Sequence, residues 1–171
     1  MITLEQKIDG YIDELSRILP SLNLVLTTAE SCTGGWLAKY CTDRAGSSKW
    51  FDCGIVSYSN HSKQKLLNVQ QDTLKNFGAV SRQTATEMAQ GALVNSTADI
   101  TVSITGIAGP EGGLKDKPVG TVWFAWQVKN GQTITACHHF KGDRNAVRQQ
   151  ALLIALEGII ENARDSSLYM G

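Results

Sequence analysis

The feature that most constrains the fold is a change of pattern within residues 22–35. An apolar run over residues 22–26 gives way to small polar residues and two glycines, and an apolar, helix-favouring pattern resumes at Trp36. Such an order predicts a strand, a tight turn and a helix. We therefore predict an α/β domain whose first strand covers residues 22–26, with Ser31 in the turn before a helix over residues 33–44.

The predicted position of Ser31 has two chemical interpretations. A helix N-terminus offers unpaired main-chain N–H groups and the positive end of the helix dipole. A hydroxyl beside these donors suits a nucleophile with an adjacent oxyanion site, and the same donors suit a bound phosphate. The residues alone leave both interpretations open.

The rest of the chain alternates predicted helices and strands. Apolar stripes at helical spacing predict amphipathic helices at residues 4–20, after Ser81 and after Asp143, and a short helix that contains Lys63. Predicted strands cover residues 54–58, 99–105, 120–129 and 132–140. The last two flank Asn130-Gly131, a dipeptide that favours a hairpin turn.

Composition narrows the function class. The 171 residues fit one domain, and 16 basic residues balance 16 acidic ones, so the chain has no electrostatic footprint for nucleic acid. The four cysteines show neither CxxC nor zinc-finger spacing, which argues against a structural metal or disulfides. Without a signal peptide pattern or an apolar run of about 18 residues, we expect no membrane segment and a cytoplasmic location.

Several motifs occur together in one order along the chain. They are TAESCTGG at residues 28–35, GIVSYSN at 54–60, GAVS at 78–81, SITGIAGP at 103–110, PVGTV at 118–122 and GDR at 142–144. In this order the chain resembles the CinA C-terminal domain family over about residues 4–163, which leaves residues 164–171 as a polar tail. The resemblance implies a single-domain three-layer α/β/α sandwich with a mixed sheet.

The resemblance also implies an activity, since members of the family are nicotinamide-nucleotide amidases. We expect hydrolysis of the carboxamide of nicotinamide mononucleotide to nicotinate mononucleotide and ammonia, without metal or cofactor, by a homodimer. The family pairs the serine at Ser31 with the lysine at Lys63 and places the tyrosine at Tyr58 beside them. The substrate-binding positions implied by the motifs are Cys32, Thr33, Gly34, Gly35, Thr105, Gly106 and Arg144.

The chemistry of the residues agrees with this expectation in part. A serine needs a base, and the sequence offers His61, His138, His139 or a lysine. Neighbouring histidines on one strand point to opposite faces and cannot both serve one serine. A lysine acts as a base near neutral pH only if its pKa is lowered by burial or by nearby positive charge.

Other roles stay open. Cys32 competes with Ser31 as the nucleophile, because thiolates form readily at helix N-termini, and the sequence assigns no role to Glu30. Trp36, Trp50 and Trp126 fit either the core or a subunit contact. A second function class is a nucleotide-binding or regulatory module without catalysis.

Overall fold

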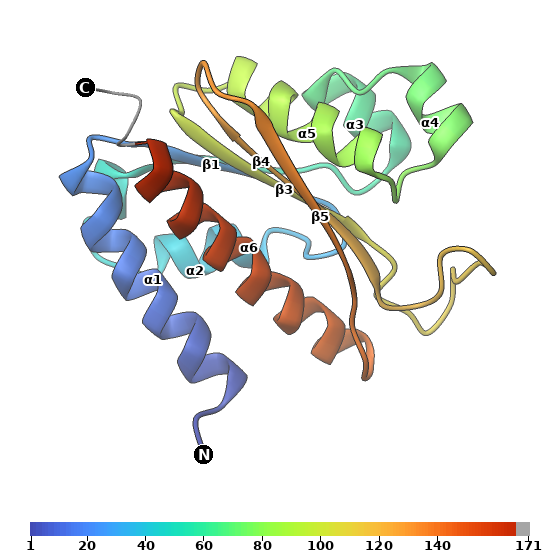
Figure 1. The fold of residues 1–171 in the computed structure, drawn as a ribbon, viewed down its shortest axis with the longest axis horizontal. Coiled ribbons are helices and arrows are strands. Elements are labelled where there is room, and N and C mark those ends of the chain that lie inside the picture. The colour runs from blue at the N-terminus through green and yellow to red at the C-terminus, as the bar shows by residue number, and fades with distance from the viewer. Residues whose placement is uncertain (167–171) are drawn as a thin grey trace.

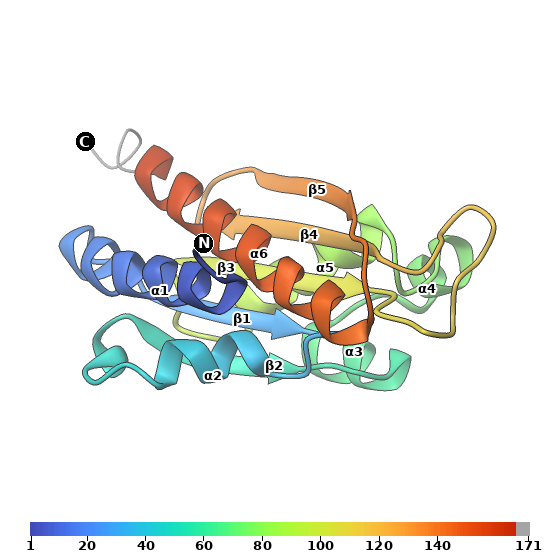
Figure 2. The same cartoon turned by 90° about the horizontal axis from the view of Figure 1, so that it is seen from below.

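The computed structural model describes residues 1–166 and has three layers (Figure 1). The strands are β1 (Leu26–Glu30), β2 (Phe51–Val56), β3 (Ile100–Gly106), β4 (Thr121–Val128) and β5 (Thr133–His139). The helices are α1 (Leu4–Ser21), α2 (Trp36–Thr42), α3 (Asn60–Leu67), α4 (Gln71–Phe77), α5 (Arg82–Val94) and α6 (Arg144–Ser166), with a 3₁₀ turn, η1, at Ser47–Lys49. Helices α1, α2 and α6 cover one face of the sheet, and α3, α4 and α5 cover the other (Figures 1 and 2). The predicted three-layer sandwich is confirmed.

The sheet is mixed, as predicted, and has the strand order β2-β1-β3-β4-β5. Strand β1 pairs in parallel with β2 and with β3, whereas β3, β4 and β5 are antiparallel. The carboxyl ends of three neighbouring parallel strands therefore meet at one edge, which is where α/β sheets commonly bind ligands.

The main core lies between the sheet and the layer formed by α1, α2 and α6. Helix α1 buries Ile8, Ile12, Leu15 and Leu19 against it. Trp50 and Trp126 are 2% and 4% exposed, and Trp36 packs partly buried against the same cluster. Two of the three tryptophans considered for a subunit contact are therefore core residues.

The predicted first strand is displaced by four residues. Leu22 closes α1 by donating its N–H to the carbonyls of Ile18 and Leu19, and Asn23 turns the chain with a left-handed φ of 53°. The strand instead uses residues 26–30, whose polar side chains find partners inside the sheet: the Thr28 hydroxyl donates to Glu30 at 3.2 Å. The apolar run at residues 22–26 does not mark the strand, because a buried strand whose polar groups are paired lacks a continuous apolar pattern.

Other boundaries also differ from prediction, and β2 covers Phe51–Val56 rather than residues 54–58. Helix α2 begins at Trp36 rather than at residue 33, because the two preceding glycines have left-handed φ values of 61° and 90°. Helix α6 continues to Ser166, so residues 164–166 of the predicted polar tail are helical. The remainder of that tail lies outside the described residues.

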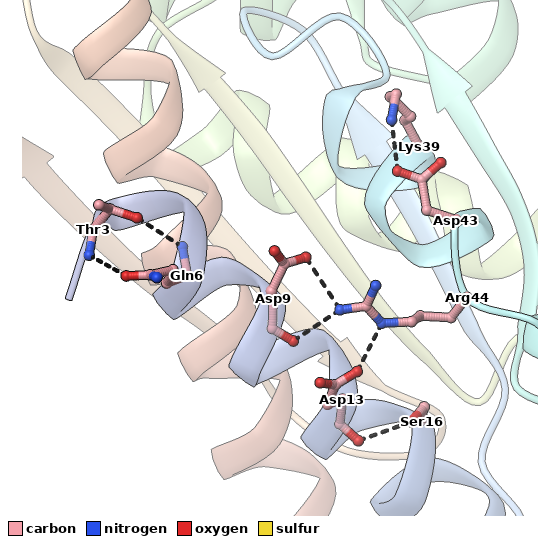
Figure 3. Close-up of polar contacts among 8 residues, drawn as sticks. All are labelled: Thr3, Gln6, Asp9, Asp13, Ser16, Lys39, Asp43 and Arg44. Carbon is pink, nitrogen blue, oxygen red and sulfur yellow. Dashed lines mark hydrogen bonds and ion pairs between the residues drawn. The ribbon is translucent and has the colours of Figure 1, made fainter.

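Polar contacts hold α1 at its N-terminus and along its middle (Figure 3). Thr3 and Gln6 form a reciprocal capping box at its N-terminus. Arg44, beyond the end of α2, donates to Asp9 at 3.1 Å and to Asp13 at 2.7 Å. This contact fixes the far end of α2 against α1.

The packing of α3 on α5 predicts the effect of a substitution at Gly91. A Cβ built on this α5 residue would lie 1.8 Å from the Leu67 carbonyl oxygen at the end of α3. We expect Gly91→Ala to lower the free energy of unfolding by about 2 kcal/mol through overpacking, measured by urea denaturation.

The matched control is Gly10→Ala in α1, where a Cβ meets nothing within 4 Å. Because alanine is the better helix former, this change should raise stability by about 0.5–1 kcal/mol. Equal effects of the two substitutions would contradict the close packing of α3 on α5.

Candidate active site

Ser31 is the first residue after β1, in the predicted strand-to-helix turn. Its N–H donates to the Ile104 carbonyl of β3 at 2.9 Å, so the turn begins between the ends of β2 and β3. Ala29, two residues earlier and therefore on the same face of the strand, packs with Leu67 of α3. The Ser31 side chain accordingly faces the layer that contains α3, and it is 7% exposed.

The turn over residues 31–35 is tight because two of its residues are glycines in left-handed conformation. The Gly34 N–H donates to the Ser31 carbonyl at 3.0 Å. A Cβ on Gly35 would lie 3.1 Å from the Val56 side chain, and its φ of 90° would strain any other residue. Glycine therefore allows the chain to pass β2 closely and to enter α2 at once.

Glu30 has a defined structural role. Its buried carboxylate accepts the N–H groups of Leu37 at 2.9 Å and Ala38 at 3.0 Å, in the first turn of α2. The expectation that this helix N-terminus offers free donors beside Ser31 is therefore wrong for these two groups, because Glu30 already occupies them. Donors for an anion at Ser31 have to come from the turn itself.

Lys63 lies against Ser31 from the neighbouring helix. Ser59 caps α3 and Lys63 is its fourth residue, which directs the side chain back over the helix N-terminus toward the sheet edge. The side chain is 1% exposed, and its Nζ donates to Ser31 Oγ at 2.8 Å. Burial lowers the pKa of Lys63 from 10.5 to about 8.

Two main-chain carbonyls complete the surroundings of the amine. Nζ donates to the carbonyl of Ser57 at 2.8 Å and to that of Tyr58 at 3.3 Å. A neutral amine has two hydrogens and one lone pair, so the carbonyls can take both hydrogens. In that state the lone pair is left to accept the Ser31 hydroxyl, and this geometry would allow the amine to act as a base toward the serine.

Cys32 differs electrostatically from Ser31. Its side chain is 5% exposed, and burial raises the pKa of the thiol to about 11. At neutral pH the thiol is protonated and lacks the reactivity of a thiolate. This disfavours Cys32 as the competing nucleophile.

Tyr58 contacts the lysine through its main chain rather than through its phenol. The side chain is 62% exposed, and its hydroxyl accepts a hydrogen bond from Arg144 at 3.1 Å. Arg144 also donates to the Gly109 carbonyl at 2.9 Å, so it joins the segment after β2 to the glycine-rich loop after β3. The structure thus places Tyr58 and Arg144 together at the exposed rim of the site.

Thr105 and Gly106 end β3 beside the Ser31 turn. The buried Thr105 hydroxyl donates to the Ala79 carbonyl at 2.7 Å, which ties the loop before α5 to the sheet edge. A Cβ on Gly106 would lie 2.6 Å from the Val122 side chain. Glycine is therefore required here for the pairing of β3 with β4.

Sequence reasoning missed two residues of the site. Arg148 of α6 donates to the carbonyls of Cys32 at 3.0 Å and Thr33 at 3.1 Å. The Ser57 hydroxyl is buried and, within the described chain, has no hydrogen-bond partner. The sequence gives a weak indication of Arg148, because this residue follows Arg144 by four positions and so shares its helix face. It gives none of the position of Ser57 beside Ser31, because that depends on the register between strands.

The remaining features lie away from Ser31. Two grooves, of about 340 and 440 Å³, border α5 and share Glu87 and Gln90, and neither is lined by Ser31 or Lys63. Residues 1–166 contain no cluster of three or more metal-ligating side chains. No helix in the same range has both the length and the apolar character needed to cross a membrane.

Comparison with known proteins gives the family. The profile of the CinA C-terminal domain matches residues 9–163. The chain belongs to the CinA C-terminal domain family. The resemblance found in the motifs is thereby confirmed.

Relatives of this CinA C-terminal domain include proteins of known name. This chain is 52% identical over 145 residues to the nicotinamide-nucleotide amidohydrolase PncC of Escherichia coli strain K12. The match covers 85% of this chain and 88% of that protein. A CinA-like protein of Leptospira interrogans is 48% identical over 81% of this chain, which corresponds to 33% of that longer protein. The crystal structure of the competence/damage inducible protein CihA from Agrobacterium tumefaciens superposes with a TM-score of 0.88 at 42% identity, covering 91% and 94% of the two chains.

The lowered pKa of Lys63 predicts how the stability of this CinA domain depends on pH. Between about 8 and 10.5 the unfolded chain retains the Lys63 proton that the folded chain has lost. The free energy of unfolding of the wild type, relative to Lys63→Met, should therefore rise across this window by up to about 3 kcal/mol. Urea denaturation of both proteins at several pH values measures the difference, and a difference that stays constant would mean that the amine is not desolvated.

Proposed function

We propose that the protein hydrolyses the carboxamide of nicotinamide mononucleotide to give nicotinate mononucleotide and ammonia. The observation that carries the proposal is the buried hydrogen bond of 2.8 Å between Lys63 Nζ and Ser31 Oγ. The substrate class is suggested by the 52% identical Escherichia coli relative, which is named a nicotinamide-nucleotide amidohydrolase.

In the proposed mechanism neutral Lys63 takes the proton of Ser31 as Ser31 Oγ attacks the amide carbonyl. With a pKa of about 8, roughly a tenth of Lys63 is neutral at pH 7, which is enough for general base catalysis. Protonated Lys63 then gives its proton to the departing nitrogen. The nitrogen leaves as ammonia, and the acyl group remains bound to Ser31 Oγ. A water molecule, deprotonated by the same amine, releases the carboxylate product.

Main-chain N–H groups after Ser31 are proposed to stabilise the oxyanion. Among the described residues, Cys32 and Thr33 donate their main-chain N–H to no other residue. Such donors are worth about 10²–10³ in rate when they point at the developing charge. Tyr58 supports the base through its carbonyl and lies with Arg144 at the entrance.

The nucleotide portion of the substrate is proposed to lie along Thr105, Gly106 and the two glycines of the Ser31 turn. Arg144 can pair with the phosphate through its planar guanidinium. Its present partners, the Tyr58 hydroxyl and the Gly109 carbonyl, are neutral and can be exchanged for an anion.

We also propose a cytoplasmic location and a homodimer. The free thiols of Cys32, Cys41, Cys53 and Cys137 fit a reducing compartment. The homodimer rests on the family resemblance, and sedimentation of the purified protein tests it.

The proposed nucleophile and base predict the effects of three variants on ammonia release. Ser31→Ala and Lys63→Met should each lower kcat by at least about 10⁴-fold, because removing one member of a dyad disables the other. Cys32→Ala keeps its main-chain N–H and should stay within about tenfold of the wild type. A coupled assay of ammonia released from nicotinamide mononucleotide measures all three.

The opposite pattern, in which Cys32→Ala is inactive and Ser31→Ala is active, would assign the nucleophile to cysteine. If the wild type is stabilised thermally by nicotinamide mononucleotide but releases no ammonia, the protein is a nucleotide-binding module. The same purified samples distinguish these outcomes.

Arg144→Gln tests the proposed phosphate contact. Losing a charged hydrogen-bonding partner of the phosphate should raise KM for nicotinamide mononucleotide by about 10- to 10²-fold. The change should have little effect on nicotinamide riboside, which lacks the phosphate. A similar loss with both substrates would place Arg144 at another part of the site.

A further inference from the structure

Arg148 contacts the back of the Ser31 turn. From α6 its Nε and one terminal nitrogen donate to the carbonyls of Cys32 and Thr33 at 3.0 and 3.1 Å. The guanidinium also lies 4.9 Å from the ring centre of Trp36, the first residue of α2. None of the ion pairs within residues 1–166 includes Arg148, so its charge is directed at the turn.

These contacts fix two peptide planes. In a trans peptide the C=O and the following N–H point in opposite directions. A guanidinium that holds the Cys32 carbonyl on one side of the turn therefore directs the Thr33 N–H to the other side. A cation on the carbonyl also polarises the peptide and strengthens its N–H as a donor.

The peptide between Thr33 and Gly34 makes hydrogen bonds within the turn. The carbonyl of Thr33 is held by the same guanidinium, and the Gly34 N–H that follows it donates to the Ser31 carbonyl. A Cβ on Gly34 would lie 3.7 Å from the terminal nitrogen of Arg148, so the turn and the guanidinium are in direct contact. Arg148 thus holds the turn that begins at the nucleophile.

We infer that Arg148 is a positioning residue for the oxyanion site, acting by aiming the Thr33 N–H at the oxygen that becomes negative when Ser31 attacks. The inference rests on the proposed function. It differs from the role of Arg144, which is at the exposed rim and is proposed to bind the ground-state substrate. Arg148 should act on the transition state and leave substrate binding unchanged.

The test measures kcat and KM for nicotinamide mononucleotide in Arg148→Gln and Arg148→Lys. Misdirecting one oxyanion donor should lower kcat about 10²-fold in Arg148→Gln, with KM within about threefold of the wild type. Arg148→Lys retains the charge but lacks the planar pair of donors, so its kcat should lie between those of the wild type and Arg148→Gln. Arg164→Gln, on the same helix and paired with Glu14, is the matched control and should turn over normally.

A second measurement separates this inference from the proposed substrate. A fluorophosphonate probe forms a Ser31 Oγ–P bond while its P–F bond breaks, with fluoride leaving and the serine proton passing to Lys63. Its phosphoryl oxygen needs the same donors, so the labelling rate should fall with kcat in the Arg148 variants. If the wild type is labelled but releases no ammonia, the substrate proposal fails while the labelling rates still test Arg148.

Three results would overturn the inference. The first is a kcat within about twofold of the wild type in both variants. The second is a raised KM with unchanged kcat, which would make Arg148 a substrate contact. The third is a wild-type protein that the probe does not label. If Arg148→Gln proves unfolded by its melting temperature, Arg148→Lys carries the test, because it keeps the charge and the aliphatic stem.

Discussion

The burial of one lysine amine is the constraint on which the site depends. Lys63 is 1% exposed and contacts the Ser31 hydroxyl and two carbonyls, all within hydrogen-bond distance. A buried amine without a counter-charge destabilises the folded protein most strongly at pH values below the pKa that the amine has in the folded state. The rest of the fold has to hold it there, and the close packing of α3 on α5 at Gly91 is one such restraint.

The Ser31 turn is held from two directions by polar side chains. Glu30 binds the first N–H groups of α2 from one side, and Arg148 binds the carbonyls of Cys32 and Thr33 from α6. Glu30 pairs N–H groups that the start of a helix leaves free, and Arg148 pairs the Cys32 carbonyl. Arg148 is a second donor to the Thr33 carbonyl, which also accepts the Trp36 N–H at 3.1 Å. Together they hold the turn in place, as the proposed oxyanion site requires, because preorganised donors do not have to reorganise during a reaction.

Local sequence patterns predict much of this arrangement, although not all of it. The turn at Ser31, the helix with Lys63, the hairpin at residues 130–131 and the Asp143 cap of α6 follow from local patterns, and the structure has each of them. The first strand lies four residues after its predicted position, because its polar residues are paired inside the sheet and give no apolar pattern. The phenol of Tyr58 points to Arg144 rather than to Lys63, which local patterns do not specify.

The sequence by itself determined the α/β class, the elements that carry the site and, through its ordered motifs, the family. These depend on periodicity, turn residues and capping, all of which act over a few residues. Only the tertiary structure decided that β1 lies between β2 and β3, that Glu30 occupies the start of α2, and that Arg148 reaches the Ser31 turn from more than 100 positions away. The physical reason is that strand order and long-range hydrogen bonds depend on how distant segments pack, and no local pattern encodes that packing.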